Sequence, residues 1–91
     1  MKLALRLYYT GGSPLSESAR QELKTLQVQF PNVEFEIEEI DVVLHPSKAE
    51  EDGITATPTL IKFSPPPGTK IVGDLTNLVK SLGLNPSPGH R

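Results

Sequence analysis

The chain of 91 residues contains no cysteine, and this absence excludes several classes of chemistry at once. Without thiols there is no disulfide framework, no thiolate metal site, no cysteine nucleophile and no thiol–disulfide exchange. The two histidines, His45 and His90, are far apart in the chain, so neither has a second histidine at a metal-ligand spacing. The sequence therefore predicts no metal site and no cofactor.

Long apolar runs and an excess of positive charge are also missing. No stretch approaches the roughly 18–20 apolar residues of a membrane span, and the segment from Met1 to Arg6 is too soon interrupted by charge for a signal peptide. The formal net charge of −2 argues against nucleic acid, because nucleic-acid-binding domains generally carry a clustered basic face. We expect a cytoplasmic protein that binds neither membrane nor nucleic acid.

The last residues differ in composition from the rest of the chain. They include Pro86, Pro88 and Gly89, which preclude a regular helix or strand. The chain as a whole is 36% apolar and 22% charged, which is typical of a globular domain that folds alone at this size. We therefore expect one folded domain over residues 1–84 and a disordered tail over residues 85–91.

The first half of the chain predicts two strands and a helix. Apolar residues alternate with others over residues 3–9, as in a strand. The Ser-Pro pair at 13–14 is typical of a helix start, and apolar residues recur at helical spacing as far as Phe30. Over residues 33–42 apolar residues alternate with glutamates, but the parity changes at Glu38-Glu39. A bulge or a strand end there would explain the change.

A short helix and a hairpin are predicted next. Residues 46–52 favour a helix, and Gly53 is well placed as its left-handed end. Two β-rich segments, residues 59–63 and 70–72, flank the rigid loop Ser64-Pro65-Pro66-Pro67-Gly68-Thr69. These segments predict two antiparallel strands.

One further helix completes the predicted order. Asp74 or Thr76 can cap it, and Gly83 ends it. The order is then β-α-β-α-β-β-α, an α/β fold in which the strand-helix-strand units require parallel pairing through right-handed crossovers. We expect a four-stranded mixed sheet in the order four-three-one-two, with the second strand at an edge.

Thr57-Pro58-Thr59, followed by an apolar run, resembles the cis-proline corner of thioredoxin-like domains. In redox members of that fold a Cys-x-x-Cys turn faces the corner, whereas the matching turn here, Tyr9 to Pro14, holds no cysteine. The resemblance implies a thioredoxin-like domain in which Pro58 is a structural cis-proline and thiol exchange has no nucleophile. It favours a binding domain and not an enzyme.

A series of motifs resembles the KaiB family of cyanobacterial circadian clock proteins. The match covers residues 5 to about 84, and its most specific parts are Ile40-Asp41-Val42, Pro46, Ala49-Glu50-Glu51-Asp52, Ala56-Thr57-Pro58-Thr59-Leu60, Pro65-Pro66-Pro67 and Ile71-Val72-Gly73-Asp74-Leu75. Membership implies a non-catalytic regulator that binds a ring-shaped KaiC-like ATPase and displaces or recruits other clock proteins. Glu38-Glu39, where the family often has basic residues, and the proline-rich tail indicate a divergent paralogue.

The resemblance also implies a choice between two folds. Members of the family occupy either a thioredoxin-like monomer or a tetramer in which the C-terminal half is rebuilt and ends in an additional strand. Prolines in the tail remove ladder donors, and residues 59–63 and 70–72 favour the hairpin. We therefore expect the thioredoxin-like monomer.

The expected partner-binding surface combines the helix over residues 46–52, the end of the second strand and the proline corner. Its predicted residues are Asp41, Ala49, Glu50, Glu51, Asp52, Thr57 and Pro58. The edge strand is a second candidate, with Phe35, Ile37 and Glu38, because its unpaired backbone groups can accept a partner strand. Its glutamates also fit a plain solvent-exposed face. The adjacent carboxylates at 50–52 point in different directions and predict no catalytic pair.

Two other functions are compatible with the residues. Glutaredoxin-like and glutathione-transferase-like folds hold glutathione at a cis-proline corner, and some use tyrosine or serine in place of cysteine. Tyr8, Tyr9, Thr10 or Ser13 would take that part here. The other alternative is a KaiB-like sensor module cut from a histidine kinase, with the proline-rich end as a linker.

Overall fold

Four strands and three helices make up the described part of the chain, residues 1–84 of a computed structural model. In chain order they are β1 (Lys2–Tyr9), α1 (Pro14–Gln29), β2 (Glu34–Asp41), α2 (Pro46–Glu51), β3 (Thr59–Ser64), β4 (Thr69–Val72) and α3 (Leu78–Ser81). The sheet order is β2-β1-β3-β4, with β1 parallel to β2 and β3 antiparallel to β1 and β4. The predicted α/β class, element order and sheet order are confirmed. The predicted tail, residues 85–91, lies outside the described residues.

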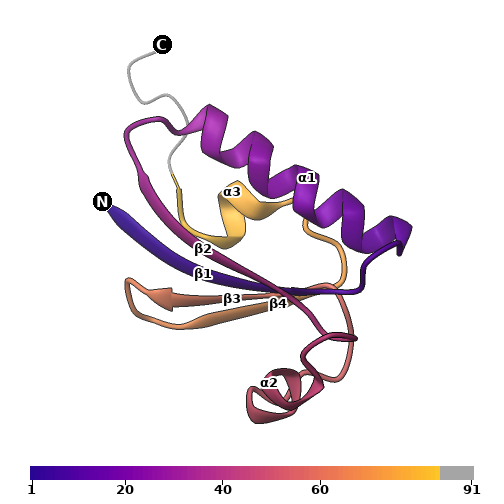
Figure 1. The fold of residues 1–91 in the computed structure, drawn as a ribbon. Coiled ribbons are helices and arrows are strands. Elements are labelled where there is room, and N and C mark those ends of the chain that lie inside the picture. The colour runs from indigo at the N-terminus through magenta and orange to yellow at the C-terminus, as the bar shows by residue number, and fades with distance from the viewer. Residues whose placement is uncertain (85–91) are drawn as a thin grey trace.

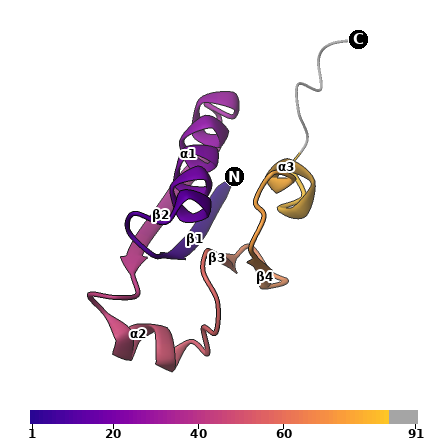
Figure 2. The same ribbon diagram turned by 90° about the vertical axis from the view of Figure 1, so that its right-hand side faces the viewer.

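The two faces of the sheet are covered unequally (Figures 1 and 2). α1 and α3 lie over one face, which we call the front face, while α2 alone lies on the opposite, back face near the ends of β1 and β2. Because side chains alternate along a strand, Leu5 and Leu7 of β1 point to the front face, and Arg6 and Tyr8 point to the back face. β1 therefore contributes to two separate clusters.

The front face holds the main core. The buried residues of this cluster are Leu3, Leu5, Leu7, Ala19, Leu23, Leu26, Leu60, Leu75, Leu78, Leu82 and Leu84. Each fully buried leucine stabilises the fold by about 1.5–3 kcal/mol relative to an exposed one. The back-face cluster is much smaller, with Tyr8, Ile40 and Ala49 as its buried members. The front core therefore forms the framework to which the back-face elements are attached.

β2 contains no bulge, so that prediction is wrong. Its parallel register with β1 runs unbroken from Lys2–Glu34 to Tyr9–Asp41. The parity changes because the covered face changes along the strand. Glu39 lies on the front face and forms an ion pair with Arg20 of α1 at 3.0 Å, whereas the next residue, Ile40, is buried on the back face beside α2.

α3 begins later than predicted. Asp74 and Thr76 do not cap it, because Asp74 Oδ1 accepts a hydrogen bond from the Thr76 amide at 2.9 Å and closes a local turn instead. Asn77 occupies the N-cap position, and Leu82 the C-cap position. The helix is consequently a single turn, and the buried Leu75 precedes it.

The predicted start of α1, the left-handed glycine after α2 and the cis-proline are confirmed. Ser13 caps α1, with its side chain accepting from the Ser16 amide at 3.5 Å, and Pro14 is the first helical residue. Gly53 follows α2 with φ +67°, the left-handed conformation that glycine adopts at lowest cost. The Thr57-Pro58 peptide bond is cis, as the resemblance implied.

Candidate protein-binding site

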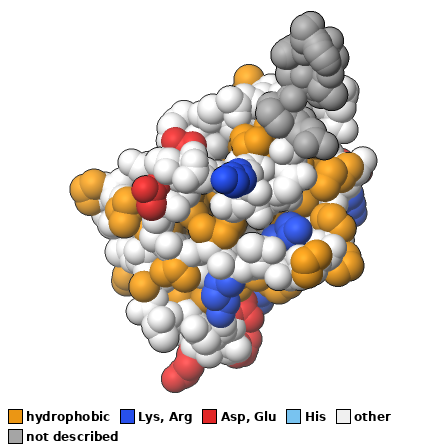
Figure 3. Space-filling view, turned by 180° about the vertical axis from the view of Figure 1, so that it is seen from behind, with side chains coloured by type: hydrophobic (Ala, Val, Ile, Leu, Met, Phe, Trp, Pro, Cys, Tyr) orange, Lys and Arg blue, Asp and Glu red, His pale blue; other side chains and the backbone are white. Residues whose placement is uncertain are grey.

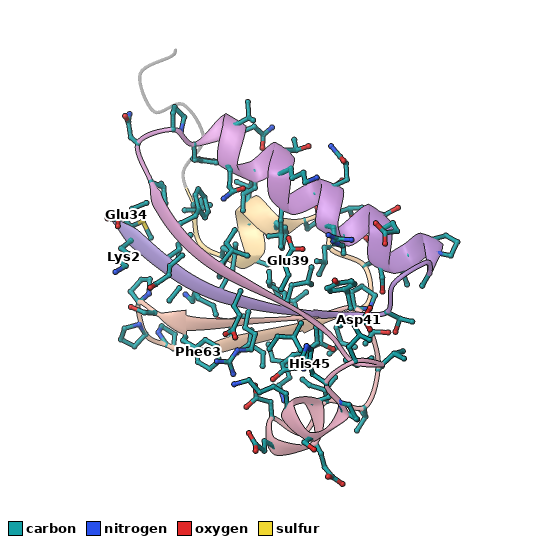
Figure 4. The ribbon with its side chains drawn as sticks, viewed as in Figure 1. Lys2, Glu34, Glu39, Asp41, His45 and Phe63 are labelled. Atoms are coloured by element: carbon teal, nitrogen blue, oxygen red, sulfur yellow. The ribbon has the colours of Figure 1, made fainter. Side chains whose placement is uncertain are left out.

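The topology brings distant parts of the chain together at one end of the sheet. β1 and β2 are parallel and β3 is antiparallel to β1, so the ends of β1 and β2 meet the start of β3. Asp41 and His45 lie at this end, and Lys2 and Glu34 lie at the opposite end (Figure 4). α2 and the proline corner therefore adjoin Asp41, as the sequence predicted.

The predicted residues of α2 divide into inward and outward positions. Ala49 is 8% exposed and packs beside Tyr8 and Ile40, so its part is packing. Glu50 and Glu51 are exposed. Figure 3 shows acidic side chains at the lower end of the molecule, where Figure 1 places α2. The outward face of α2 is therefore a negatively charged surface.

Asp52, directly after α2, is the centre of a polar network. Its Oδ2 atom accepts a hydrogen bond from the Tyr8 hydroxyl at 2.5 Å and another from Arg6 Nη1 at 2.8 Å. Arg6 Nε donates to Glu38 Oε1 at 2.8 Å, and the Arg6 guanidinium carbon lies 4.8 Å from the centroid of the Phe63 ring. This network joins α2 to β1, β2 and β3. The Tyr8 hydroxyl oxygen also lies 3.1 Å from the Lys48 carbonyl.

The network shifts the pKa values of Asp52, Tyr8 and Arg6. Hydrogen bonding by Tyr8, together with Arg6, holds the pKa of Asp52 below its ordinary value against the opposing effect of burial. Burial, and then the bond to Asp52, raises the pKa of Tyr8 to about 12. The bond to Asp52 is also the largest cause that raises the pKa of Arg6. The charged carboxylate and the neutral phenol are therefore the stable forms at neutral pH.

Two open grooves border α2. The larger, about 450 Å³, is lined by Glu38, Glu39, Ile40, Leu44, His45, Pro46, Ser47, Lys48 and Glu51. The smaller, about 220 Å³, is lined by Val42, Ala49, Ile54, Thr55, Ala56 and Thr57. The loop between β2 and α2 joins them, since Val42 lines the smaller and Leu44 the larger. In this loop two consecutive aliphatic residues are largely exposed, Val43 at 69% and Leu44 at 72%.

The second predicted surface is the edge of β2, which among the described residues 1–84 pairs with β1 alone. Phe35 and Ile37 are half-buried against the front core, whereas Glu38 is exposed and bonded to Arg6. The edge therefore offers backbone groups and carboxylates to solvent, with its apolar side chains turned away.

Three of the four hydroxyl residues that the glutathione alternative invokes, Tyr8, Thr10 and Ser13, make hydrogen bonds within the domain. The hydroxyls of Thr10 and Thr57 are hydrogen-bonded to each other at 2.7 Å, and the Ser13 hydroxyl caps α1. The Tyr8 hydroxyl lies on the back face against Asp52, and Tyr9 lies under the Arg20 guanidinium at 4.6 Å. Pro58 itself is fully buried. The hydroxyls of Tyr8, Thr10 and Ser13 are thus committed to contacts inside the domain.

Sequence reasoning missed Arg6 as a site residue, as well as Val43, Leu44 and Phe63. A charged residue in the middle of a central strand was the available signal for Arg6, because such a charge requires a partner on the covered face. Within residues 1–84 no group of three or more His, Asp or Glu side chains is arranged to hold a metal ion. In the same residues no helix has the length and apolar character needed to cross a bilayer.

Taken together, the fold and the site define a class: a thioredoxin-like domain without a thiol centre, whose exposed features gather around a short second helix. The family model described as the KaiB domain matches residues 6–85. The chain belongs to the KaiB family. It is 48% identical over 79 residues to the circadian clock oscillator protein KaiB of Gloeothece citriformis, covering 86% of this chain and 74% of that protein. It is 41% identical over 88 residues to the circadian clock protein KaiB3 of Synechocystis, covering 96% and 86%.

Solved structures agree with the fold. The N-terminal domain of Synechococcus elongatus SasA aligns with a TM-score of 0.71 and 27% identity, over 91% of this chain and 85% of that domain. Mitochondrial thioredoxin 3 of Saccharomyces cerevisiae aligns with a TM-score of 0.72 and 25% identity, over 89% and 76%. The thioredoxin-like fold is therefore confirmed.

Proposed function

We propose that this chain is a circadian clock regulator that acts in the cytoplasm by binding other proteins and catalyses no reaction. Membership of the KaiB family supports the clock role. We further propose that its main partner is a KaiC-like ATPase and that the chain binds it as a monomer. The partner would contact α2, the loop between β2 and α2, and the corner at Thr57.

The observation that carries this proposal is the exposed loop beside α2. Val43 and Leu44 are mostly exposed, Glu50 and Glu51 of α2 are also exposed, and Leu44 and Glu51 line the same groove. Protein interfaces commonly combine an apolar centre with a polar rim. Exposed aliphatic residues near exposed carboxylates favour a partner surface that is apolar with basic residues around it.

The free edge of β2 supports a second contact. An edge strand with unpaired backbone groups accepts a partner strand by main-chain hydrogen bonds. We propose that other clock proteins dock on this edge in competition with the partner that binds α2. The two surfaces share Glu38, which lies on the edge and also lines the larger groove beside α2.

Binding to a purified KaiC-type ATPase from the same organism, with ATP or ADP present, tests the proposal. The double substitution Glu50→Lys and Glu51→Lys should weaken binding at least tenfold by reversing the charge of α2. Glu22→Lys, on α1, is the matched control and should leave the affinity unchanged. No binding of the wild-type chain in either nucleotide state would refute the ATPase as partner.

The likeness to the N-terminal domain of SasA favours one second candidate, a KaiB-like sensor module of a larger protein. The reading frame of the gene decides between the two. Continuation past Arg91 into a kinase domain would establish the sensor module, and a stop codon there would exclude it.

A further inference from the structure

α2 is attached to the rest of the domain by few contacts, and several of them involve Asp52. A six-residue helix is too short to be stable by itself. Ala49 is its only buried member, so apolar packing fixes little of it. The other attachments are polar, and most of them involve Asp52: its carboxylate accepts from Tyr8 and Arg6, and its carbonyl accepts from Lys70 Nζ at 3.4 Å. The Tyr8 hydroxyl also bonds to the Lys48 carbonyl of α2 at 3.1 Å.

We propose that Tyr8 and Arg6 are positioning residues that hold α2 in the pose that a partner recognises, an inference that rests on the function proposed above. Both side chains belong to β1, the central strand between β2 and β3. Tyr8 is 0% exposed, so a partner protein cannot touch it. Any effect of its hydroxyl on binding must therefore pass through its two hydrogen-bond partners, the Asp52 carboxylate and the Lys48 carbonyl of α2.

Three residues contact the Arg6 side chain and together determine its orientation. Glu38 of β2 holds its Nε atom, Asp52 holds its Nη1 atom, and Phe63 of β3 lies against its guanidinium face. A planar guanidinium with these contacts has one orientation, which a lysine ammonium would not reproduce. The carboxylate of Asp52 is consequently aligned by the sheet and not by the helix that it follows.

Release of Asp52 would free the whole outward surface of α2. Irregular segments, residues 42–45 and 52–58, connect α2 to β2 and β3. Glu50 and Glu51 precede Asp52 directly, so their placement relative to Val43 and Leu44 depends on where Asp52 is held. The polar network thus sets the geometry of the proposed binding surface without taking part in the contact.

Hydrogen exchange in the free protein tests the positioning role. Tyr8→Phe removes the hydroxyl and keeps the ring. Tyr9→Phe is the matched control, because Tyr9 is the next residue of β1 and points to the front face. The reporters are the amides of Asp52 and Ile54, which bond to Lys48 and Ala49 carbonyls at 3.2 and 2.9 Å. We expect exchange about tenfold faster in Tyr8→Phe, the size expected for loss of one hydrogen bond to a charged group. Tyr9→Phe should match the wild type.

Affinity for the KaiC-type ATPase supplies the second readout. Tyr8→Phe should weaken binding about five- to tenfold, and Arg6→Lys should also weaken it despite keeping the charge. Combining Tyr8→Phe with Asp52→Asn should cost less than the sum of the two single substitutions, because both change the hydrogen bond between Tyr8 and the Asp52 carboxylate.

Each outcome decides a different point. Exchange in Tyr8→Phe equal to that in Tyr9→Phe would overturn the positioning role. Faster exchange with unchanged affinity would show that the pose of α2 does not govern binding, which also overturns the proposal. Failure of the wild-type chain to bind the ATPase would refute the proposed function, while the exchange data would still decide whether Tyr8 holds α2.

Discussion

Arg6 and Arg20 make similar contacts on opposite faces of the sheet, but the helices that they attach differ in how much apolar surface they bury. Arg6 bonds to Glu38 at 2.8 Å and lies 4.8 Å from the Phe63 ring centroid. Arg20 bonds to the adjacent Glu39 at 3.0 Å and lies 4.6 Å from the Tyr9 ring centroid. Each arginine therefore combines one carboxylate of β2 with one aromatic face.

What differs is how the attached element is otherwise held. The further partner of Arg20 is Glu17 on its own helix, and α1 is already fixed by buried leucines. The further partner of Arg6 is Asp52, and α2 contributes only Ala49 to a buried cluster. We therefore expect the ion pairs of Arg20 to add little to the stability of α1, which is packed on the front core. We expect those of Arg6 to add more to the attachment of α2, which has little apolar packing.

The largest expected effect concerns the front core. Leu23→Ala removes a side chain that is 1% exposed, and we expect a loss of about 2–5 kcal/mol in unfolding free energy. At this chain length such a loss lowers Tm by roughly 10 °C or more. Val28→Ala on the same helix, where Val28 is 80% exposed, is the control and should stay within about 0.5 kcal/mol. Thermal unfolding followed by circular dichroism measures both, and equal losses would contradict a dominant front core.

Substitution of each arginine by methionine, in two separate variants, tests the comparison directly. Arg6→Met leaves Asp52 with only the Tyr8 hydroxyl, and we expect a loss of about 1–3 kcal/mol. Arg20→Met should lower the unfolding free energy much less, because the Arg20 side chain is 34% exposed against 22% for Arg6 and α1 stays packed. Denaturant unfolding of both variants under one set of conditions gives the answer. A larger loss in Arg20→Met would reverse the ranking of the two faces.

Acid should weaken the back face before the front face. Because the folded pKa of Asp52 is lowered, its contribution is complete above the unfolded value of about 3.9 and is lost as pH falls through the folded pKa. The stability difference between wild type and Asp52→Asn should therefore be constant near neutral pH and shrink below about pH 4. At high pH the difference between wild type and Tyr8→Phe should shrink between about 10 and about 12. Differences that do not vary with pH would contradict this assignment.

The smallest expected effect lies at the end of β2. A Cβ atom on Gly11 would stand 2.9 Å from Asp41 Oδ2, which has to move away. Asp41 Oδ1 accepts from the Val43 amide at 2.9 Å, so Gly11→Ala should shift the Val43 amide resonance and cost at most about 1 kcal/mol. Gly68→Ala, whose Cβ would meet the Lys62 carbonyl at an ordinary 3.5 Å, is the control. An unchanged Val43 resonance in Gly11→Ala would show that Asp41 does not fix this loop.

Prediction from the sequence worked where the signal was local. The alternation of leucines in β1, the Ser13–Pro14 helix start and the left-handed Gly53 each follow from the conformational preferences of a few neighbouring residues. The change of parity in β2 was seen as well. Its cause was misassigned, because the pattern shows which residues are buried and not what buries them.

The site was less predictable for the same reason. Proximity of Asp41, α2 and Thr57 followed from topology, since parallel strands end at one edge. The part played by Arg6 did not, because Asp52 lies 46 positions away in the chain and no local rule pairs them. The exposure of Val43 and Leu44 is likewise a matter of what the rest of the chain leaves uncovered.

By itself, the sequence determined the strand and helix order, the absence of thiol chemistry and membership of the KaiB family. Those properties depend on residue types and short spacings, which the chain carries before it folds. Only the tertiary structure decided that the Tyr8 hydroxyl and the Arg6 guanidinium both bond to the carboxylate of Asp52, the residue that follows α2. Such contacts form when β1 is placed between β2 and β3 and the chain returns over its back face, because residues 44 and 46 positions apart in the chain meet only when it folds.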